Sequence, residues 1–129
     1  MKVFRFMSQE EFEGFQIGDV LLNNTNHKEL GQKTDSVGFC FMDCEDYSPS
    51  SAYEFLEGIV SEDIVAVFEV DESLLTKSSG VYAAPLWWDD VSWFSTMTVD
   101  EYCCTFYSNK DFKLLSYANP KYFEWIEVA

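Results

Sequence analysis

A single arginine occurs among the 129 residues, and its position constrains the fold more than any other feature of the sequence. Arg5 lies inside an apolar run, Val3-Phe4-Arg5-Phe6-Met7. In a β-strand its side chain shares one face with Val3 and Met7. A guanidinium keeps its charge at physiological pH and is costly to bury unpaired. Arg5 must therefore line a cavity, meet a carboxylate or meet an anionic ligand.

The charge of the chain is concentrated in its central segment. The formal net charge is −15, and residues 34–109 carry 15 acidic groups against one basic group, Lys77. Such a field repels nucleic-acid backbones and favours cationic surfaces. The segment is either a solubilising surface or a docking face for a basic protein partner, of the kind that itself binds nucleic acid. Direct binding of nucleic acid by this chain is not expected.

The four cysteines predict a reducing compartment. No signal peptide precedes them, because acidic residues from Glu10 onward interrupt the N-terminal apolar stretch. No run approaches the roughly 20 apolar residues of a membrane helix. We therefore expect a cytoplasmic protein without membrane contact, whose thiols pack as small hydrophobes. Cys40 and Cys44 have a spacing acceptable for zinc, but Cys103 and Cys104 would point to opposite faces of a strand, so no metal site is predicted.

The order of the periodic segments predicts one α+β domain over residues 1–129, with a mixed, largely antiparallel sheet and two short helices in the N-terminal half. The apolar run over residues 64–70 is the strongest strand and is expected to be central. Further strands are expected over residues 2–7, 36–42, 102–107 and 112–117. Residues 20–22 predict a brief strand or the entry to a turn, and residues 122–128 predict a last edge strand or a helical turn.

Both helices have start signals in the sequence. Ser8 and Glu11 have the spacing of a capping box, and Gly18 ends the helix that follows. Ser48-Pro49 opens the second helix, because proline is favoured at the first helical position. The inward side chains of this helix are expected to be Ala52, Phe55, Leu56 and Ile59.

Turn and loop residues separate these elements. Residues 23–35 read as a polar loop, and Gly38 in the next strand allows close approach of a strand or a ligand. Residues 78–80 predict a turn, and residues 108–111 predict a hairpin turn between the strands on either side. The cluster of Trp87, Trp88 and Trp93 is expected in the core or at a subunit interface.

Three polar residues on or beside expected strands occur in a suggestive order, and two of them stand at strand starts. Arg5 is on the first strand, Ser36 follows Thr34-Asp35 at the start of the next convincing strand, and Glu101 starts a later one. This arrangement resembles the ADP-ribosyltransferase family. The resemblance implies an ADP-ribosyltransferase-like fold, NAD as cofactor, and transfer of ADP-ribose to a protein or nucleic-acid target. It also implies that Arg5 and Ser36 hold NAD and that Glu101 is the catalytic residue at the nicotinamide ribose.

The residue types suit that chemistry. A guanidinium can pair with a diphosphate through two hydrogen bonds, and a serine hydroxyl can hold a ribose or a carboxamide. A carboxylate can hold the ribose 2′-hydroxyl and stabilise positive charge at the anomeric carbon as nicotinamide leaves. Val99 stands where many arginine-modifying members have an acidic residue or glutamine, which argues against arginine as the acceptor. Further NAD contacts are expected from Asn24, His27, Thr34, Phe41 and Tyr53.

Two functions from different classes remain open. The first is an ADP-ribosyltransferase-like enzyme, similar in size and acidity to small phage proteins that inhibit host defence, such as anti-CRISPR transferases. It requires a cleft that joins Arg5, Ser36 and Glu101. The second is a non-enzymatic acidic inhibitor that covers the basic groove of a nucleic-acid-binding partner. In that case Arg5 is a structural residue paired with a carboxylate, and Glu101 is a solvated charge.

Overall fold

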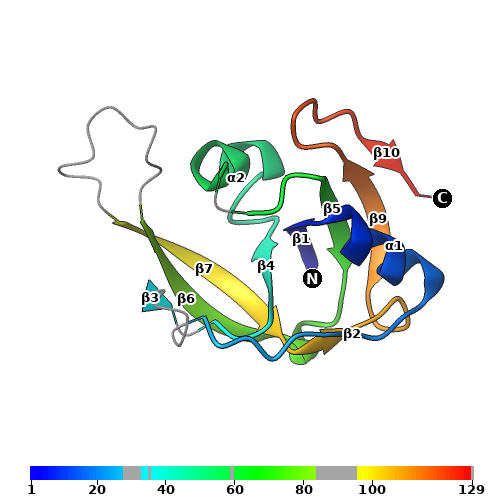
Figure 1. Ribbon diagram of the computed structural model, residues 1–129, viewed down its shortest axis with the longest axis horizontal. Coiled ribbons are helices and arrows are strands. Elements are labelled where there is room, and N and C mark those ends of the chain that lie inside the picture. The colour runs from blue at the N-terminus through cyan, green and yellow to red at the C-terminus, as the bar shows by residue number, and fades with distance from the viewer. Residues whose placement is uncertain (28–32, 35, 59, 84–95, 129) are drawn as a thin grey trace.

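The fold is built around one sheet of eight strands (Figure 1). A computed structural model describes residues 1–27, 33–34, 36–58, 60–83 and 96–128. The strand order is β10-β9-β5-β1-β4-β7-β6-β3, and β2 and β8 form a separate pair. All pairings among the described residues are antiparallel. The predicted α+β class with a largely antiparallel sheet is confirmed.

The elements follow one another along the chain as β1 (Lys2–Met7), α1 (Gln9–Ile17), β2 (Leu21–Leu22), β3 (Lys33–Thr34), β4 (Phe39–Asp43), α2 (Pro49–Leu56), β5 (Ile64–Glu69), the 3-10 turn η1 (Glu72–Leu74), β6 (Thr76–Ala83), β7 (Thr96–Cys104), β8 (Phe106–Tyr107), β9 (Lys113–Ala118) and β10 (Ile126–Glu127). Strand β5 lies between β1 and β9, as its uninterrupted apolar sequence predicts. No helix in the described ranges has the length and apolar character that crossing a membrane requires.

Both helices begin at the predicted residues, and α1 ends at the predicted glycine, whereas α2 ends at Leu56, before the expected inward position at residue 59. The Ser8 hydroxyl accepts from the backbone N–H of Glu11, and Gly18 closes α1 in the left-handed conformation. Ser48 caps α2, with Pro49 at its first position. The capping box is only half formed, because the Glu11 carboxylate binds Arg5 and Tyr107 instead of the Ser8 backbone.

The sheet carries a hydrophobic core on each face. Val3 and Met7 of β1 pack with the side chains that α1 buries, Phe12 and Phe15. The alternate residues of β1, Phe4 and Phe6, pack with those that α2 buries, Ala52 and Leu56. The predicted alternation along residues 3–7 is therefore confirmed. Arg5 belongs to the face that α1 covers.

Two expectations about the C-terminal half are wrong. Residues 78–80 lie inside β6, where Ser78 and Gly80 pair with Glu101 and Val99 of β7. The segment around residues 108–111 does turn, but its flanking strands do not pair with each other: β8 pairs with β2, and β9 pairs with β5. The expected edge strand at the C-terminus is present as β10. The three tryptophans of the 87–93 cluster, Ile59 and Asp35 lie outside the described residues.

Gly38 marks a close approach between chain segments just before β4. Its φ is +79°, and a Cβ atom there would collide with the carbonyl oxygen of Cys104 and lie 2.8 Å from that of Asn23. The predicted close approach is therefore made by neighbouring backbone. Both crowding atoms belong to the main chain, so they cannot move aside as a flexible side chain would.

Replacing Gly38 with alanine is expected to lower the free energy of unfolding by roughly 3–5 kcal/mol, from left-handed strain and overpacking together. Gly58 is the matched control, because its φ is +83° and no atom lies within 4 Å of the position that a Cβ would take there. Gly58→Ala should cost only about 1–2 kcal/mol. Urea unfolding of both variants measures the difference, and equal losses would contradict a close approach at Gly38.

Candidate functional site

The predicted catalytic glutamate and the predicted serine are in direct contact. Ser36 lies just before β4, where its backbone carbonyl accepts from the N–H of His27 at 3.2 Å. Glu101 lies on β7, and only 4% of its surface is exposed. The Ser36 hydroxyl donates to Glu101 Oε2 at 2.5 Å, and its oxygen is 2.9 Å from the hydroxyl of Ser78 on β6. Residues 65 positions apart thus form one buried polar centre.

A cavity of about 180 Å³ adjoins this centre. Its polar wall includes Arg5, His27 and Glu101, together with Asn23. Its apolar wall comes from Phe4, Phe6, Met42, Leu56 and Val60. His27 donates from Nε2 to the carbonyl of Gly38 at 3.2 Å, which places its proton on Nε2. His27 and Glu101 therefore border one partly open cavity, and Ser36 is joined to it through Glu101. Arg5 also borders this cavity, although its guanidinium is directed to Glu11 on the α1 side of the sheet.

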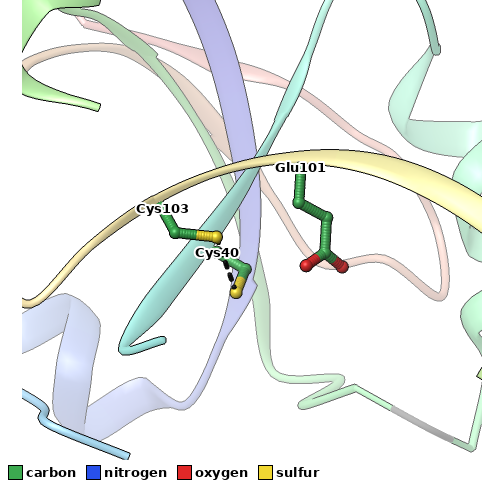
Figure 2. Close-up of side chains that lie close together, drawn as sticks. All are labelled: Cys40, Glu101 and Cys103. Atoms are coloured by element: carbon green, nitrogen blue, oxygen red, sulfur yellow. Dashed lines mark hydrogen bonds between the residues drawn. The ribbon is translucent and has the colours of Figure 1, made fainter. Parts of the chain in front are cut away.

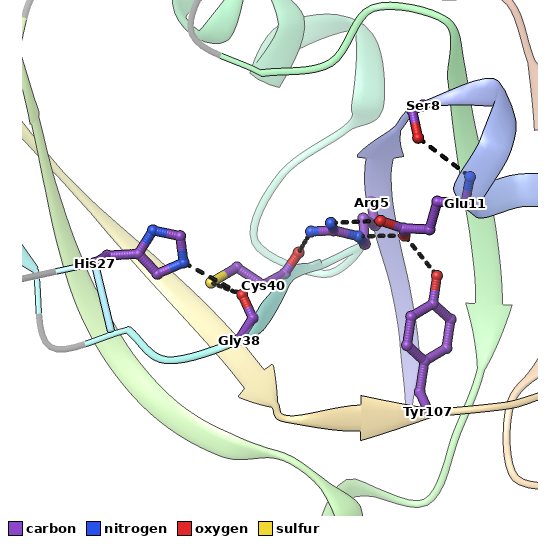
Figure 3. Close-up of polar contacts among 7 residues, drawn as sticks. All are labelled: Arg5, Ser8, Glu11, His27, Gly38, Cys40 and Tyr107. Atoms are coloured by element: carbon purple, nitrogen blue, oxygen red, sulfur yellow. Dashed lines mark hydrogen bonds and ion pairs between the residues drawn. The ribbon is translucent and has the colours of Figure 1, made fainter. Parts of the chain in front are cut away.

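Arg5 already has a carboxylate partner (Figure 3). Its Nε and Nη2 donate to Glu11 of α1 at 2.7 and 2.8 Å, and its Nη1 donates to the carbonyl of Cys40 at 3.2 Å. The Tyr107 hydroxyl donates to the same carboxylate at 2.6 Å. The guanidinium carbon also lies 5.0 Å from the centre of the Phe39 ring, a cation–π distance. Two of the three possibilities for Arg5 are realised together, since it lines a cavity and meets a carboxylate.

The ion pair perturbs the groups around it. Burial lowers the pKa of Arg5, but the hydrogen bond and the charge of Glu11 outweigh it and raise the pKa above its ordinary value. Burial, followed by the negative charge of Glu11, raises the pKa of Tyr107 well above its ordinary value. Arg5 is therefore always charged and Tyr107 always a hydrogen-bond donor at physiological pH. A buried centre of this kind holds α1 against the sheet.

The other expected NAD contacts are only partly at the cavity. Phe41 is fully buried, and its ring packs on Phe68, Tyr107 and Phe112 in the α1-side core, so it has no surface to offer a ligand. This corrects its assignment as a cofactor contact. Tyr53 of α2 reaches the cavity only indirectly, because its ring packs 5.7 Å from that of Phe6.

The two remaining candidates lie on the segment that precedes β4. Asn24 is exposed, and its neighbour Asn23 takes the place at the cavity wall. The backbone of Thr34 belongs to β3 and pairs with Gly80 of β6. Of the expected cofactor residues, Arg5 and His27 border the cavity, and Ser36 contacts Glu101.

Two cysteines also belong to this centre, and sequence reasoning did not place them there. Cys40 of β4 and Cys103 of β7 are register partners, and their Sγ atoms are 3.2 Å apart (Figure 2). Their hydrogen bond, supported by burial, raises the pKa of Cys40, whereas the same hydrogen bond lowers the pKa of Cys103 against the opposing effect of burial. The alternation of side chains along a strand could have indicated part of this cluster, because it puts Glu101 and Cys103 on the same face of β7.

Comparisons of the chain with protein-family models, with curated proteins and with solved structures gave no match. The function is therefore inferred from the geometry of the site itself.

Proposed function

We propose that the protein is an ADP-ribosyltransferase-like enzyme that uses NAD and passes ADP-ribose to a protein or nucleic-acid target. One observation carries the proposal: Ser36 donates to Glu101 Oε2 at 2.5 Å beside a cavity that Arg5 and His27 also line. The resemblance in sequence required these segments, which are far apart in the chain, to meet. NAD would supply the ADP-ribose group and nicotinamide as the leaving group.

Glu101 is the residue that acts on the reacting bond. Its carboxylate is largely removed from water, and an anion in such a place stabilises nearby positive charge more strongly than one in solvent. The Ser36 hydrogen bond fixes one carboxylate oxygen, Oε2. The carboxylate then holds the ribose hydroxyl and stabilises the charge that develops at the anomeric carbon.

The cavity is sized for part of the dinucleotide. Ligand pockets for whole small molecules are usually about 300–1,000 Å³, whereas this one is about 180 Å³. We assign it to the nicotinamide ring, which would rest on the apolar wall at Phe4 and Phe6 with His27 and Asn23 beside its carboxamide. The remainder of NAD would extend out of the cavity.

The role of Arg5 differs from the one that the resemblance implies. Its Nε and Nη2 are engaged by Glu11, so a bidentate clamp on the diphosphate would require the ion pair to break. We therefore assign Arg5 a positioning role. It anchors the Cys40 carbonyl and thereby the end of β4 that borders the cavity.

Nicotinamide release tests the proposal. The purified protein is incubated with NAD, with and without candidate acceptor proteins and nucleic acids, and free nicotinamide is quantified together with labelled ADP-ribose on the acceptor. The proposal predicts release that depends on Glu101. The absence of release and of transfer at millimolar NAD across these acceptors would overturn it.

A second candidate function is carried by the acidic segment around α2. Residues 43–63 contain seven acidic side chains, and residues 34–76 contain no basic one. Glu45, Asp46, Glu54 and Glu57 are all exposed. Within the described part of the chain, the ion pairs are Met1–Glu69 and Arg5–Glu11, so neither neutralises this segment. Such a surface suits a basic groove on a nucleic-acid-binding partner.

A charge-reversal experiment distinguishes this docking function from the enzymatic function. Changing Glu45, Asp46, Glu54 and Glu57 to lysine should weaken binding of a defined arginine-rich peptide at least about tenfold, because like charges would then face each other. Reversal of four exposed acidic residues elsewhere, Glu10, Glu13, Asp19 and Glu127, is the control with the same change in net charge. Titrations of the peptide at rising salt concentration measure the affinity of both variants. Equal weakening in the two variants would show only a net-charge effect and would contradict a docking face at α2.

A further inference from the structure

Cys40, Glu101 and Cys103 form a cluster on the paired strands β4 and β7. Cys40 and Cys103 face each other across this pair of strands, and Glu101 is two positions before Cys103, on the same strand face. Figure 2 shows the three side chains directed toward one another. One ligand atom from each, two thiol sulfurs and a carboxylate oxygen, lie within 4.8 Å of one another.

We propose that Cys40, Cys103 and Glu101 form a binding site for a divalent metal ion of the zinc type. Two thiolates and one carboxylate are a donor set that Zn²⁺ accepts, and hard ions such as Mg²⁺ do not use thiolates. Tetrahedral Zn–S bonds of about 2.3 Å put two sulfurs about 3.8 Å apart. The present separation of 3.2 Å therefore needs only a small rotation of the two side chains. Binding releases the two thiol protons to solvent.

Two serine hydroxyls already orient the proposed ligand side chains. The Ser36 hydroxyl holds Oε2 of Glu101, and the Ser78 hydroxyl lies 3.7 Å from Cys103 Sγ. Metal ligands in proteins are commonly oriented by such outer partners, whose loss typically weakens binding 10- to 100-fold. The two serines are themselves 2.9 Å apart, so the carboxylate and the thiol are connected through one polar chain.

The site has room for a fourth ligand and a route to solvent. Cys40 and Glu101 line the cavity of about 180 Å³, and Cys103 lines a second one of about 320 Å³. His27 faces the first cavity, and its Nε2 approaches the same Gly38 carbonyl oxygen that Cys40 Sγ approaches, as Figure 3 shows. His27 is the one histidine of the chain and our candidate for the fourth ligand. To bind the metal, its Nε2 would give up the hydrogen bond to Gly38, with the proton carried on Nδ1 instead.

The metal site does not depend on the proposed enzymatic function, but it shares Glu101 with it. A carboxylate that ligates a metal ion cannot at the same time hold a ribose hydroxyl. Bound metal would therefore inhibit NAD cleavage. A metal titration contains no NAD, so its result is separate from the outcome of the transferase test.

Titration of the reduced protein with Co²⁺ and then Zn²⁺ tests the site. We expect one equivalent of Co²⁺ to produce sulfur-to-metal charge-transfer absorption and Zn²⁺ to displace it. Cys40→Ser and Cys103→Ser should each lower the affinity at least about 100-fold, and His27→Ala should lower it about tenfold. Cys44→Ser is the matched control, because Cys44 is also a half-buried free thiol but lies outside the cluster.

Circular dichroism and urea unfolding establish that each variant is folded before its affinity is compared. The proposal is overturned if the unmodified protein shows no charge-transfer band. It is also overturned if the signal survives unchanged in Cys40→Ser and Cys103→Ser, or if it disappears in Cys44→Ser. Glu101→Gln provides a further arm, since loss of the carboxylate should weaken binding while both thiolate contributions to the absorption remain.

Discussion

Glu101→Gln is expected to lower nicotinamide release from NAD by roughly 10²–10³-fold, the loss typical when a pre-organised electrostatic group is removed from an active site. Glutamine keeps the shape of the side chain and can still meet the Ser36 hydroxyl. It loses the negative charge that opposes the charge at the anomeric carbon. The loss should therefore fall on kcat more than on KM. Steady-state kinetics with NAD measures both parameters.

Two variants make this result specific. Ser36→Ala should lower kcat about tenfold or more, because it removes a hydrogen bond to a charged group. Asp100→Asn removes the neighbouring carboxylate, which points to the opposite face of β7, and should leave kcat within about twofold. If Asp100→Asn and Glu101→Gln had the same effect, the assignment of Glu101 as the catalytic residue would be wrong.

A large effect on stability is expected from breaking the Arg5–Glu11 ion pair. Arg5→Met leaves the Glu11 carboxylate largely buried, with the Tyr107 hydroxyl as its remaining partner among the residues that the structure describes. Glu11→Gln leaves a guanidinium without its counter-charge. Removing one member of a buried pair typically costs about 3–5 kcal/mol. We expect each single variant to lose that much free energy of unfolding, measured in urea at neutral pH.

The exposed ion pair between the N-terminal amine and Glu69 is the natural control, because 54% of the Glu69 side chain is exposed. Glu69→Gln should cost at most about 1 kcal/mol. The double variant Arg5→Met/Glu11→Leu should be more stable than either single variant, since it removes both buried charges together. Single variants that lose no more stability than Glu69→Gln would rule out a structural role for the Arg5 pair.

Local signals predicted the elements well. Ser8 and Ser48-Pro49 start the helices because hydroxyl caps and an N-terminal proline act within one turn of the chain. The two faces of β1 follow from alternation alone. The strand β6 was missed because its sequence at residues 78–80, Ser-Ser-Gly, has turn composition, and pairing with β7 overrides it.

The non-local part of the fold could not be read in the same way. Strand β9 pairs with β5 instead of with its neighbour in sequence, and no residue near the turn at 108–111 signals that choice. Ser36 and Glu101 were predicted to meet through a resemblance to a family. The meeting of Cys40 with Cys103 was not foreseen, because it depends on the register between β4 and β7.

The partner of Arg5 shows the same limit. The sequence established that the guanidinium needed a cavity, a carboxylate or an anion, but Glu11 was assigned to the cap of its own helix. Only the packing of α1 on the sheet reveals that the carboxylate points to Arg5 instead. A residue six positions away thus took the place that the resemblance gave to the diphosphate of NAD.

Titration of NAD into the isotopically labelled protein, followed by heteronuclear NMR, tests the central claim most directly. We expect saturable shifts at the backbone amides of His27, Ser36 and Glu101, with much smaller shifts at Glu54 and Glu57 on α2. In Glu101→Gln the shifts at His27 should persist at higher NAD concentration. An absence of shifts around Ser36 and Glu101 at millimolar NAD would contradict a nucleotide site at this cavity.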